Sequence, residues 1–419
     1  MSSEVPKISS KDLLAKMQMQ YYVELNKAKY DKKIIAWASS IVPQEFMEAM
    51  DIAVAYPENH AAAISARKGS LRYIDYADKM GYSPDICSYA RINLAYAEME
   101  TDEIPGLPKP NFVVCTNNIC NVLVKWYESL AHQFKVPFFL IDVPFNYEST
   151  GVDEETIRFT GLLPRERLDY IKEQFKEFTA FLEKICGKKF NEEKFKKVME
   201  ISNRVAKAWS RAMDYAAAVP SPMDGFQMFN YMMMMVCMRG REETAQLYDL
   251  IAEEMEQNIK DGKSHFPMMQ QYRVMWDGIA CWPYLKHNYT TMLSEGMVIV
   301  GSTYPKAWEL VYEPGNMDQM ANIYAGIGNN RTMEDQVVAR SAIQRHCKCD
   351  GVVYHMNRSC KIMDMMQPEM RRQIVEETNI PFVSFDGDQS DPKNFSEAQF
   401  ETRIQALVEN IDARREEAE

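Results

Sequence analysis

The sequence predicts an α/β protein made of two related parallel-sheet units, with helices before the first unit and between the two. Two stretches share one construction: Phe112–Cys120 (FVVCTNNIC) and Gly351–Cys360 (GVVYHMNRSC) each run from β-forming residues through polar residues to a cysteine. Each is followed, after a segment of helical length, by a strand of similar spelling, Val136–Asp142 (VPFFLID) or Ile380–Asp386 (IPFVSFD). Strands that alternate with helices favour parallel sheets joined by right-handed crossovers.

The repetition extends to the two strands that precede each of these stretches. Ile34–Pro43 resembles Arg273–Pro283, and Ile52–Pro57 (IAVAYP) resembles Val298–Pro305 (VIVGSTYP). We therefore expect the two units to be related by internal duplication.

Four segments follow from this pattern. Residues 1–32 are expected to be a helical N-terminal segment, and residues 33–150 the first α/β domain. Residues 151–270 form a mainly helical domain in this prediction, because charged helical patterns such as EKFKKVMEISNRVAKAW fill them and no convincing strand is found. Residues 271–419 complete the chain as the second α/β domain.

Composition limits the classes of partner. The chain of 419 residues has a net charge of -12, which argues against nucleic acid and against an anionic membrane surface. No apolar run approaches the roughly 20 residues of a membrane span, and the start MSSEVPKISSKD lacks the apolar stretch of a signal peptide. Nine cysteines, odd in number and irregularly spaced, are expected to be reduced. A soluble cytoplasmic protein is predicted.

Three of the cysteines are found where helices are predicted to begin. Cys87 follows Pro84 and precedes the helix predicted for Ser88–Ala97, while Cys120 and Cys360 begin the helices after their strands. Helix N-termini favour a thiolate, and chemistry in parallel sheets collects beyond the carboxyl ends of the strands. A purely structural role for a buried Cys87 stays the alternative.

Two polar positions fall at equivalent strand ends. Ser39 and Ser40 follow the first strand, and Glu58 stands at the end of the second strand and the start of the alanine-rich helix that follows. A carboxylate there faces the amide dipoles of the helix. Glu58 is thus a candidate functional residue, with simple helix capping as the alternative, and Ser40 is chosen over Ser39 by position.

The other cysteines fit less well. The sequence His346-Cys347-Lys348-Cys349 has the spacing of half a zinc site, but no partner CxxC is evident, and Cys347 precedes its strand. Cys115 lies inside its strand, and Cys186 and Cys237 are expected to be packing residues.

The methionine-rich run Tyr231–Met238 is predicted mainly as core. Because methionine is adaptable enough to line a pocket, the run is also a secondary candidate for contact with an acyl chain.

Common nucleotide and hydrolase motifs are absent from the sequence. There is no GxxxxGK[ST] loop, no GxGxxG after a strand and no GxSxG elbow. What remains is a set of three thiols, Cys87, Cys120 and Cys360, which suits an iron–sulfur cluster or zinc. Three protein ligands leave one metal position open for a substrate.

The motifs WASS, YPENHAA, CSYAR, NNIC and NRSC, in this order along two flavodoxin-like halves separated by helices, resemble the 2-hydroxyacyl-CoA dehydratases, relatives of the benzoyl-CoA reductases. The resemblance covers essentially the whole chain, and the PENHAA segment is similar to the α-type subunit. It implies a [4Fe–4S] cluster with three cysteine ligands, Cys87, Cys120 and Cys360, and one open iron.

The resemblance also implies a reaction and partners. An (R)-2-hydroxyacyl-CoA would lose water through a ketyl radical to give an (E)-2-enoyl-CoA, with Ser40 and Glu58 holding the leaving hydroxyl or moving protons. The partners would be a β-type subunit in a heterodimer and an ATP-dependent activator protein as electron donor. The acyl group stays open among lactoyl, phenyllactyl and branched aliphatic chains, as do the residues that bind CoA.

Three other functions stay open at this point. A subunit like those of benzoyl-CoA reductase would reduce an arene ring. A structural or interaction protein would hold zinc in place of the cluster, and a β-type subunit would relay electrons without binding acyl-CoA.

Overall fold

The computed structural model describes residues 8–99, 106–159 and 161–418. The first helix, α1, spans Ser10–Tyr30 and is capped by the Ser9 side chain. The part of the N-terminal prediction that concerns residues 1–7 lies outside the described residues. In the described parts of the chain, no helix combines the length and the apolar character that crossing a membrane requires.

The first unit holds a four-stranded parallel sheet in the order β2-β1-β3-β4. Its strands are β1 (Ile35–Ala38), β2 (Ala53–Ala55), β3 (Phe112–Thr116) and β4 (Phe138–Ile141). The helices between them are α2 (Gln44–Ala49), α3 (Pro57–Ala66), α4 (Ser70–Lys79), α5 (Ser88–Glu98) and α6 (Val122–Phe134). β1 and β3 are buried throughout, which explains why their sequences are apolar without alternation.

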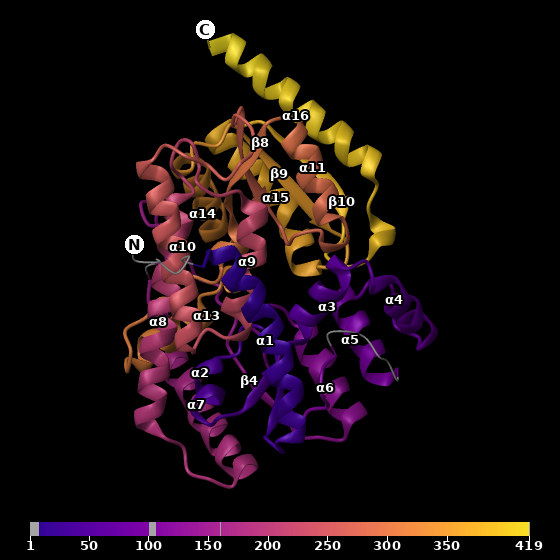
Figure 1. The fold of residues 1–419 in the computed structure, drawn as a ribbon, viewed down its shortest axis with the longest axis vertical. Coiled ribbons are helices and arrows are strands. Elements are labelled where there is room, and N and C mark those ends of the chain that lie inside the picture. The colour runs from indigo at the N-terminus through magenta and orange to yellow at the C-terminus, as the bar shows by residue number, and fades with distance from the viewer. Residues whose placement is uncertain (1–7, 100–105, 160, 419) are drawn as a thin grey trace, which may run out of the picture.

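The second unit holds another four-stranded parallel sheet, in the order β10-β9-β7-β8. Its strands are β7 (Tyr272–Asp277), β8 (Met297–Ser302), β9 (Gly351–Asn357) and β10 (Phe382–Gly387). Its α-helices are α11 (Leu285–Ser294), α12 (Thr303–Lys306), α13 (Met317–Ala325), α14 (Met333–His346), α15 (Lys361–Thr378) and α16 (Glu397–Ala418), and the short 3-10 turns are Trp282–Tyr284, Gly328–Asn330 and Pro392–Asn394. Figure 1 shows this sheet at one end of the molecule, with α16 extending away from it.

Two parallel α/β units are therefore confirmed. When the strands are numbered within each unit, both sheets have the order 2-1-3-4. A shared order is what two copies of one unit would have, but common ancestry and a flavodoxin-like origin stay predictions.

The segment between the sheets is mainly helical, as predicted. It contains α7 (Arg165–Cys186), α8 (Glu192–Tyr215), α9 (Gly225–Cys237) and α10 (Glu242–Lys260). The expectation that it has no strand is wrong, because β5 (Val152–Asp153) pairs antiparallel with β6 (Arg158–Phe159). Each of these strands is two residues long, too short to leave an alternating pattern.

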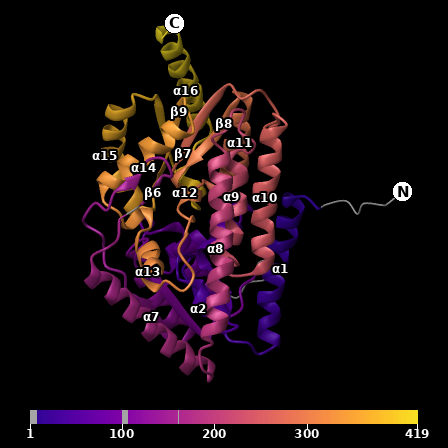
Figure 2. The same ribbon diagram turned by 90° about the vertical axis from the view of Figure 1, so that its left-hand side faces the viewer.

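The helical segment joins the two units. Figure 2 shows the long helices α1, α8, α9 and α10 side by side, and the structure has contacts of α1 with both α9 and α10. At its N-terminus α9 lies directly on β8, where a Cβ on Gly225 would come within 2.3 Å of Ile299 Cγ2, so glycine is needed for this close approach. One continuous apolar core includes side chains of both sheets and of these helices.

Candidate active site

The three cysteines of interest all lie at helix starts. Cys87 and Cys360 are the N-cap residues of α5 and α15, and Cys120 lies two residues before the first residue of α6. Backbone N–H groups of the following turns donate hydrogen bonds to all three sulfur atoms; the donors are Tyr89, Ala90, Val122, Leu123 and Met363. The predicted helix-start positions are therefore correct.

The structure brings these three thiols together from both units. Burial raises the pKa of Cys87 to about 12 and that of Cys120 to about 11, and the neighbouring thiol of Cys120 adds to the rise at Cys87. The pKa of Cys360 is also raised, first by burial and then by the thiols of Cys87 and Cys120. Such mutual effects require short separations, although the three residues are up to 273 positions apart in the sequence (360 minus 87).

The thiols are neighbours without converging on one point. Within residues 8–99, 106–159 and 161–418, no three His, Cys, Asp or Glu side chains are arranged to hold a metal ion. A single zinc ion needs its donors about 2.0 to 2.3 Å from a common centre. A cluster of several irons takes each thiolate at a different iron, so an all-sulfur donor set spread over three helix starts fits it better.

A buried polar loop after β10 connects the two units at the thiols. Asp388 Oδ1 accepts a hydrogen bond from Ser88 Oγ at 2.5 Å, and Asp388 Oδ2 accepts one from the backbone N–H of Ser359 at 3.1 Å. Gln389 Nε2 lies 3.5 Å from Cys87 Sγ and donates to Ser359 Oγ at 3.1 Å. Ser88, Ser359, Asp388 and Gln389 are all buried. They fix the loops that carry Cys87 and Cys360.

Sequence reasoning missed these four residues. Asp388 and Gln389 follow the parallel strand β10 in DGDQSD, and a position after a parallel strand is the type that drew attention to Glu58. The position of the loop was therefore predictable, but the contacts of Ser88 with Ser359 and Asp388 span 271 and 300 residues and leave no local pattern.

Glu58 and Ser40 form a second polar group at the ends of neighbouring strands. Ser40 follows β1, and Glu58 is the second residue of α3. Glu58 Oε1 accepts hydrogen bonds from Ser40 N at 3.0 Å and Ser40 Oγ at 3.3 Å, and Oε2 accepts one from Tyr127 Oη at 2.8 Å. Burial raises the pKa of Glu58, and these donors partly oppose the rise.

The two adjacent serines point to different surroundings. Ser39 is fully buried, and its hydroxyl accepts a hydrogen bond from the backbone N–H of Thr116 at 3.2 Å, which ties β1 to β3. Ser40 contacts Glu58 and lines a cavity. The geometry thus supports the choice of Ser40, while its role in a reaction stays a prediction.

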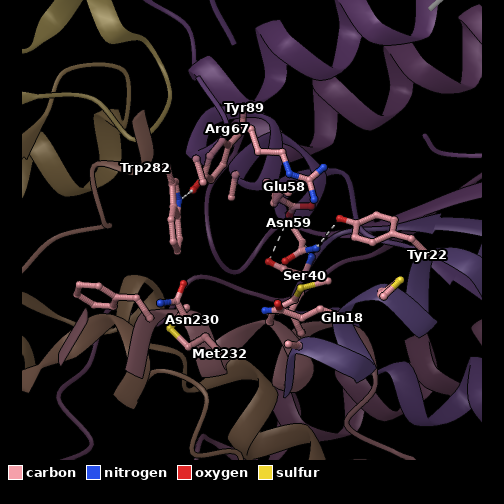
Figure 3. A pocket seen from close by; sticks show the side chains of 18 of the residues that line it. Gln18, Tyr22, Ser40, Glu58, Asn59, Arg67, Tyr89, Asn230, Met232 and Trp282 are labelled. Carbon is pink, nitrogen blue, oxygen red and sulfur yellow. Dashed lines mark hydrogen bonds between the residues drawn. The ribbon is translucent and has the colours of Figure 1, made fainter. Parts of the chain in front are cut away.

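The cavity beside Ser40 and Glu58 has a volume of about 790 Å³. It lies between α1, α3 and α9 and is bounded by aromatic side chains of the second unit, among them Trp282, Tyr304 and Trp308. Figure 3 shows Trp282, Tyr89, Glu58, Ser40, Asn230 and Met232 around one open space.

Two tyrosines connect this cavity with the thiols. Tyr89 lines the cavity, lies two residues after Cys87 and accepts a hydrogen bond from Trp282 Nε1 at 2.5 Å (Figure 3). Tyr304 also lines the cavity, and its pKa is raised by burial and further by Glu58 and Cys360. A molecule in the cavity would therefore lie next to Glu58 and against the two tyrosines that neighbour Cys87 and Cys360.

The other cysteines belong to the interior, except Cys186, which is half-buried in α7 and packs against the core. Cys115 is fully buried inside β3, and Cys237 is buried in α9. Cys347 and Cys349 lie in a separate apolar cluster against β7, β8 and β9, where Arg273 holds the Cys347 carbonyl through Nη2 at 2.9 Å. Their packing is that of core residues.

The methionine-rich run is divided between the core and the cavity, and its contact with an acyl chain stays a prediction. Met234 and Met235 are fully buried in the core, whereas Met232, Met233 and Val236 line the cavity.

Comparisons with known proteins identify the family of the chain. Residues 39–411 match the family model described as 2-hydroxyglutaryl-CoA dehydratase, D-component. The chain is 44% identical to the (R)-2-hydroxyisocaproyl-CoA dehydratase alpha subunit of Clostridioides difficile, over 96% of this chain and 95% of that protein. It is 40% identical to the (R)-phenyllactyl-CoA dehydratase alpha subunit of Clostridium sporogenes, over 99% and 98% of the two chains. A more distant relative, one of the subunits of the benzoyl-CoA reductase of Thauera aromatica, is 24% identical over 90% and 89%.

Proposed function

Because the chain belongs to the family of 2-hydroxyglutaryl-CoA dehydratase D-components, we propose that it is the α-type subunit of a hydro-lyase that converts an (R)-2-hydroxyacyl-CoA into an (E)-2-enoyl-CoA and water. The observation that carries this proposal is the meeting of three thiols from both units beside a cavity that contains Ser40 and Glu58. The names of the relatives support the reaction class.

In this proposal, Cys87, Cys120 and Cys360 hold a [4Fe–4S] cluster with one iron free of protein ligands. When bound, the cluster supplies an open Lewis-acidic iron and a site for one-electron chemistry. The helix-start N–H groups around the three sulfurs would stabilise the negative charge of the thiolates.

One-electron chemistry answers a specific difficulty of the reaction. The proton to be lost is on the β-carbon, where an enolate of the thioester cannot stabilise the charge. Addition of one electron to the thioester carbonyl gives a ketyl radical anion, which expels the α-hydroxyl and makes the β-proton acidic. Loss of that proton and return of the electron give the enoyl thioester, so the electron is not consumed.

The chain's own residues have two tasks in this scheme. Ser40 and Glu58 hold the α-hydroxyl, and the raised pKa of Glu58 suits a carboxyl group that exchanges a proton with the leaving hydroxide. Tyr127 fixes the carboxyl group through its 2.8 Å hydrogen bond. The aromatic rings of Trp282, Tyr304 and Trp308 exclude water from the radical.

The same cavity suggests how CoA enters. The face of α3 that lines it carries three alanines, Ala62, Ala63 and Ala66, and leads from Glu58 to Arg67. Nine residue steps of α-helix separate these two positions by about 14 Å along the axis. We propose that the pantetheine arm lies along the alanines and that Arg67 meets a CoA phosphate.

The shared strand order gives a reason for the position of the thiols. Cys120 follows β3 and Cys360 follows β9, the third strand of each unit. We infer that the flavodoxin-like units are copies whose equivalent loops both became cluster ligands, with Cys87 added from α5.

A β-type subunit and an ATP-dependent activator complete the proposed system, which would work in the cytoplasm, where ATP is available. The test is turnover of 2-hydroxyacyl-CoA by the anaerobically purified chain, with and without partner subunit, activator, reductant and ATP. We expect activity only in the complete mixture. Sustained dehydration by the isolated chain without ATP would contradict the proposal.

A further inference from the structure

One helix face lines the side of the cavity opposite α3. Phe229, Met232, Met233 and Val236 of α9 all line it, at the spacing i, i+3, i+4 and i+7 that places residues on one face of a helix. The other side of the same helix packs into the core, so this face is held rigidly. Methionine side chains on a fixed backbone adapt to the shape of an apolar ligand.

The α9 side of the cavity has no charged side chain among the described residues that line it. Trp282 and Trp308 extend the apolar surface of the α9 face, and Asn230 is its exposed polar residue. In the described lining of the cavity, the cation is Arg67, which lies on the α1 side. Burial raises the pKa of Tyr22 in α1, and the charge of Arg67 opposes part of that rise. Figure 3 shows Asn230 and Met232 across the open space from Glu58.

We propose that the α9 face is the acyl subsite and selects an uncharged acyl group with a branched aliphatic or aromatic end. The inference rests on the proposed function, because Ser40 and Glu58 must hold the α-hydroxyl for the acyl chain to point at α9. A carboxylate at the far end of the acyl group would lose its water at this face without a cation to pair with. A short acyl group such as lactoyl, which has a single methyl beyond the α-carbon, would leave the methionines and tryptophans without contacts.

The size of the effect follows from buried carbon groups. A branched six-carbon acyl group has three more carbons than lactoyl, and each buried carbon contributes about 0.8 kcal/mol, so kcat/KM should differ by roughly fifty-fold. A carboxyl-bearing chain should be rejected at least as strongly.

The experiment compares four 2-hydroxyacyl-CoA thioesters on the complete, cluster-loaded complex: lactoyl, 2-hydroxyisocaproyl, phenyllactyl and 2-hydroxyglutaryl. Both kcat/KM and the dissociation constant of each enoyl-CoA product are measured, the latter by quenching of tryptophan fluorescence. We expect the branched and aromatic thioesters to have the highest kcat/KM, and their enoyl-CoA products to have the lowest dissociation constants. Preference for lactoyl or 2-hydroxyglutaryl would overturn the inference while leaving the proposed function intact, whereas failure to bind or convert any thioester would overturn both.

A charge variant sharpens the test. Asn230→Arg places a cation at an exposed position of the α9 side, where folding is not disturbed. It should raise the ratio of kcat/KM for 2-hydroxyglutaryl-CoA to kcat/KM for the branched thioester by tenfold or more. The matched control is Gln257→Arg on the exposed side of α10, away from the cavity. An unchanged ratio in Asn230→Arg, or the same change in both variants, would show that the acyl group does not lie at α9.

Discussion

Tyr127→Phe isolates one hydrogen bond to the proposed proton-handling group. Tyr127 is fully buried in α6, and its hydroxyl donates to Glu58 Oε2 at 2.8 Å. The other carboxyl oxygen keeps both bonds from Ser40. The variant therefore removes a single donor and leaves the ring in place.

The magnitude follows from the charge on the acceptor. A hydrogen bond to a charged group contributes about 1.5 to 3 kcal/mol, which corresponds to about one to two pKa units. Burial already raises the pKa of Glu58, and the thiols of Cys115 and Cys120 and the hydroxyl of Tyr304 also face it. Loss of the Tyr127 donor should raise this pKa further. Because the protonated carboxyl group supplies the proton to the leaving hydroxide, the alkaline limb of kcat/KM should move about one to two units to higher pH.

The free energy of unfolding also depends on the protonation of Glu58. Because the folded pKa of Glu58 is raised, the contribution of this group to the free energy of unfolding is fully present below its unfolded pKa and is lost as pH rises through the folded pKa. Tyr127→Phe should widen that window toward higher pH.

The assay is a pH profile of kcat/KM on the loaded complex, together with urea unfolding at several pH values. The control is Tyr21→Phe, which removes a buried hydroxyl that donates to the Val54 carbonyl at 2.9 Å. That variant should lower stability by about 1 kcal/mol without moving the alkaline limb of kcat/KM. The reasoning would be refuted if the alkaline limb of the kcat/KM profile did not move in Tyr127→Phe, or if it moved equally in both variants.

Three further predictions concern the same site. Glu58→Gln keeps the shape of the side chain, so iron content should be unchanged while kcat falls by about a hundredfold or more; full activity would show that Glu58 only caps α3. Arg67→Gln should weaken acyl-CoA binding and reduce its salt dependence between low and physiological ionic strength; unchanged salt dependence would remove Arg67 from the phosphate site. Gln389→Leu removes the donor 3.5 Å from Cys87 Sγ and should lower the reduction potential of the cluster, measured by a spectroscopic redox titration at full iron loading; an unchanged potential would leave Gln389 with a packing role alone.

The local features of the fold were accessible from the sequence. Buried parallel strands are short apolar runs, and the residues at their ends are polar, so β3 and β9 predicted the positions of Cys120 and Cys360. Cys87 was found because its helix start is marked by Pro84 and Ser88. These signals lie within a few residues of the sites they predict.

The missed features depend on contacts between distant segments. Tyr127 lies 69 residues from Glu58, and its sequence context is an ordinary amphipathic helix. Met232 and Met235 look equivalent in the run of methionines, and only the packing of α9 makes one a cavity residue and the other a core residue. The β5–β6 pair was missed because two-residue strands have no periodicity to detect.

Iron and acid-labile sulfide in the anaerobically purified chain test the central claim most directly. The wild-type chain and Cys347→Ala should contain about four irons each, with Cys347→Ala reduced in stability by no more than a small core change allows. Cys87→Ala, Cys120→Ala and Cys360→Ala should each lose or degrade the cluster, because two thiolates hold it poorly. Full iron loading in Cys360→Ala together with iron-free Cys347→Ala would contradict the account and move the metal site to residues 346–349.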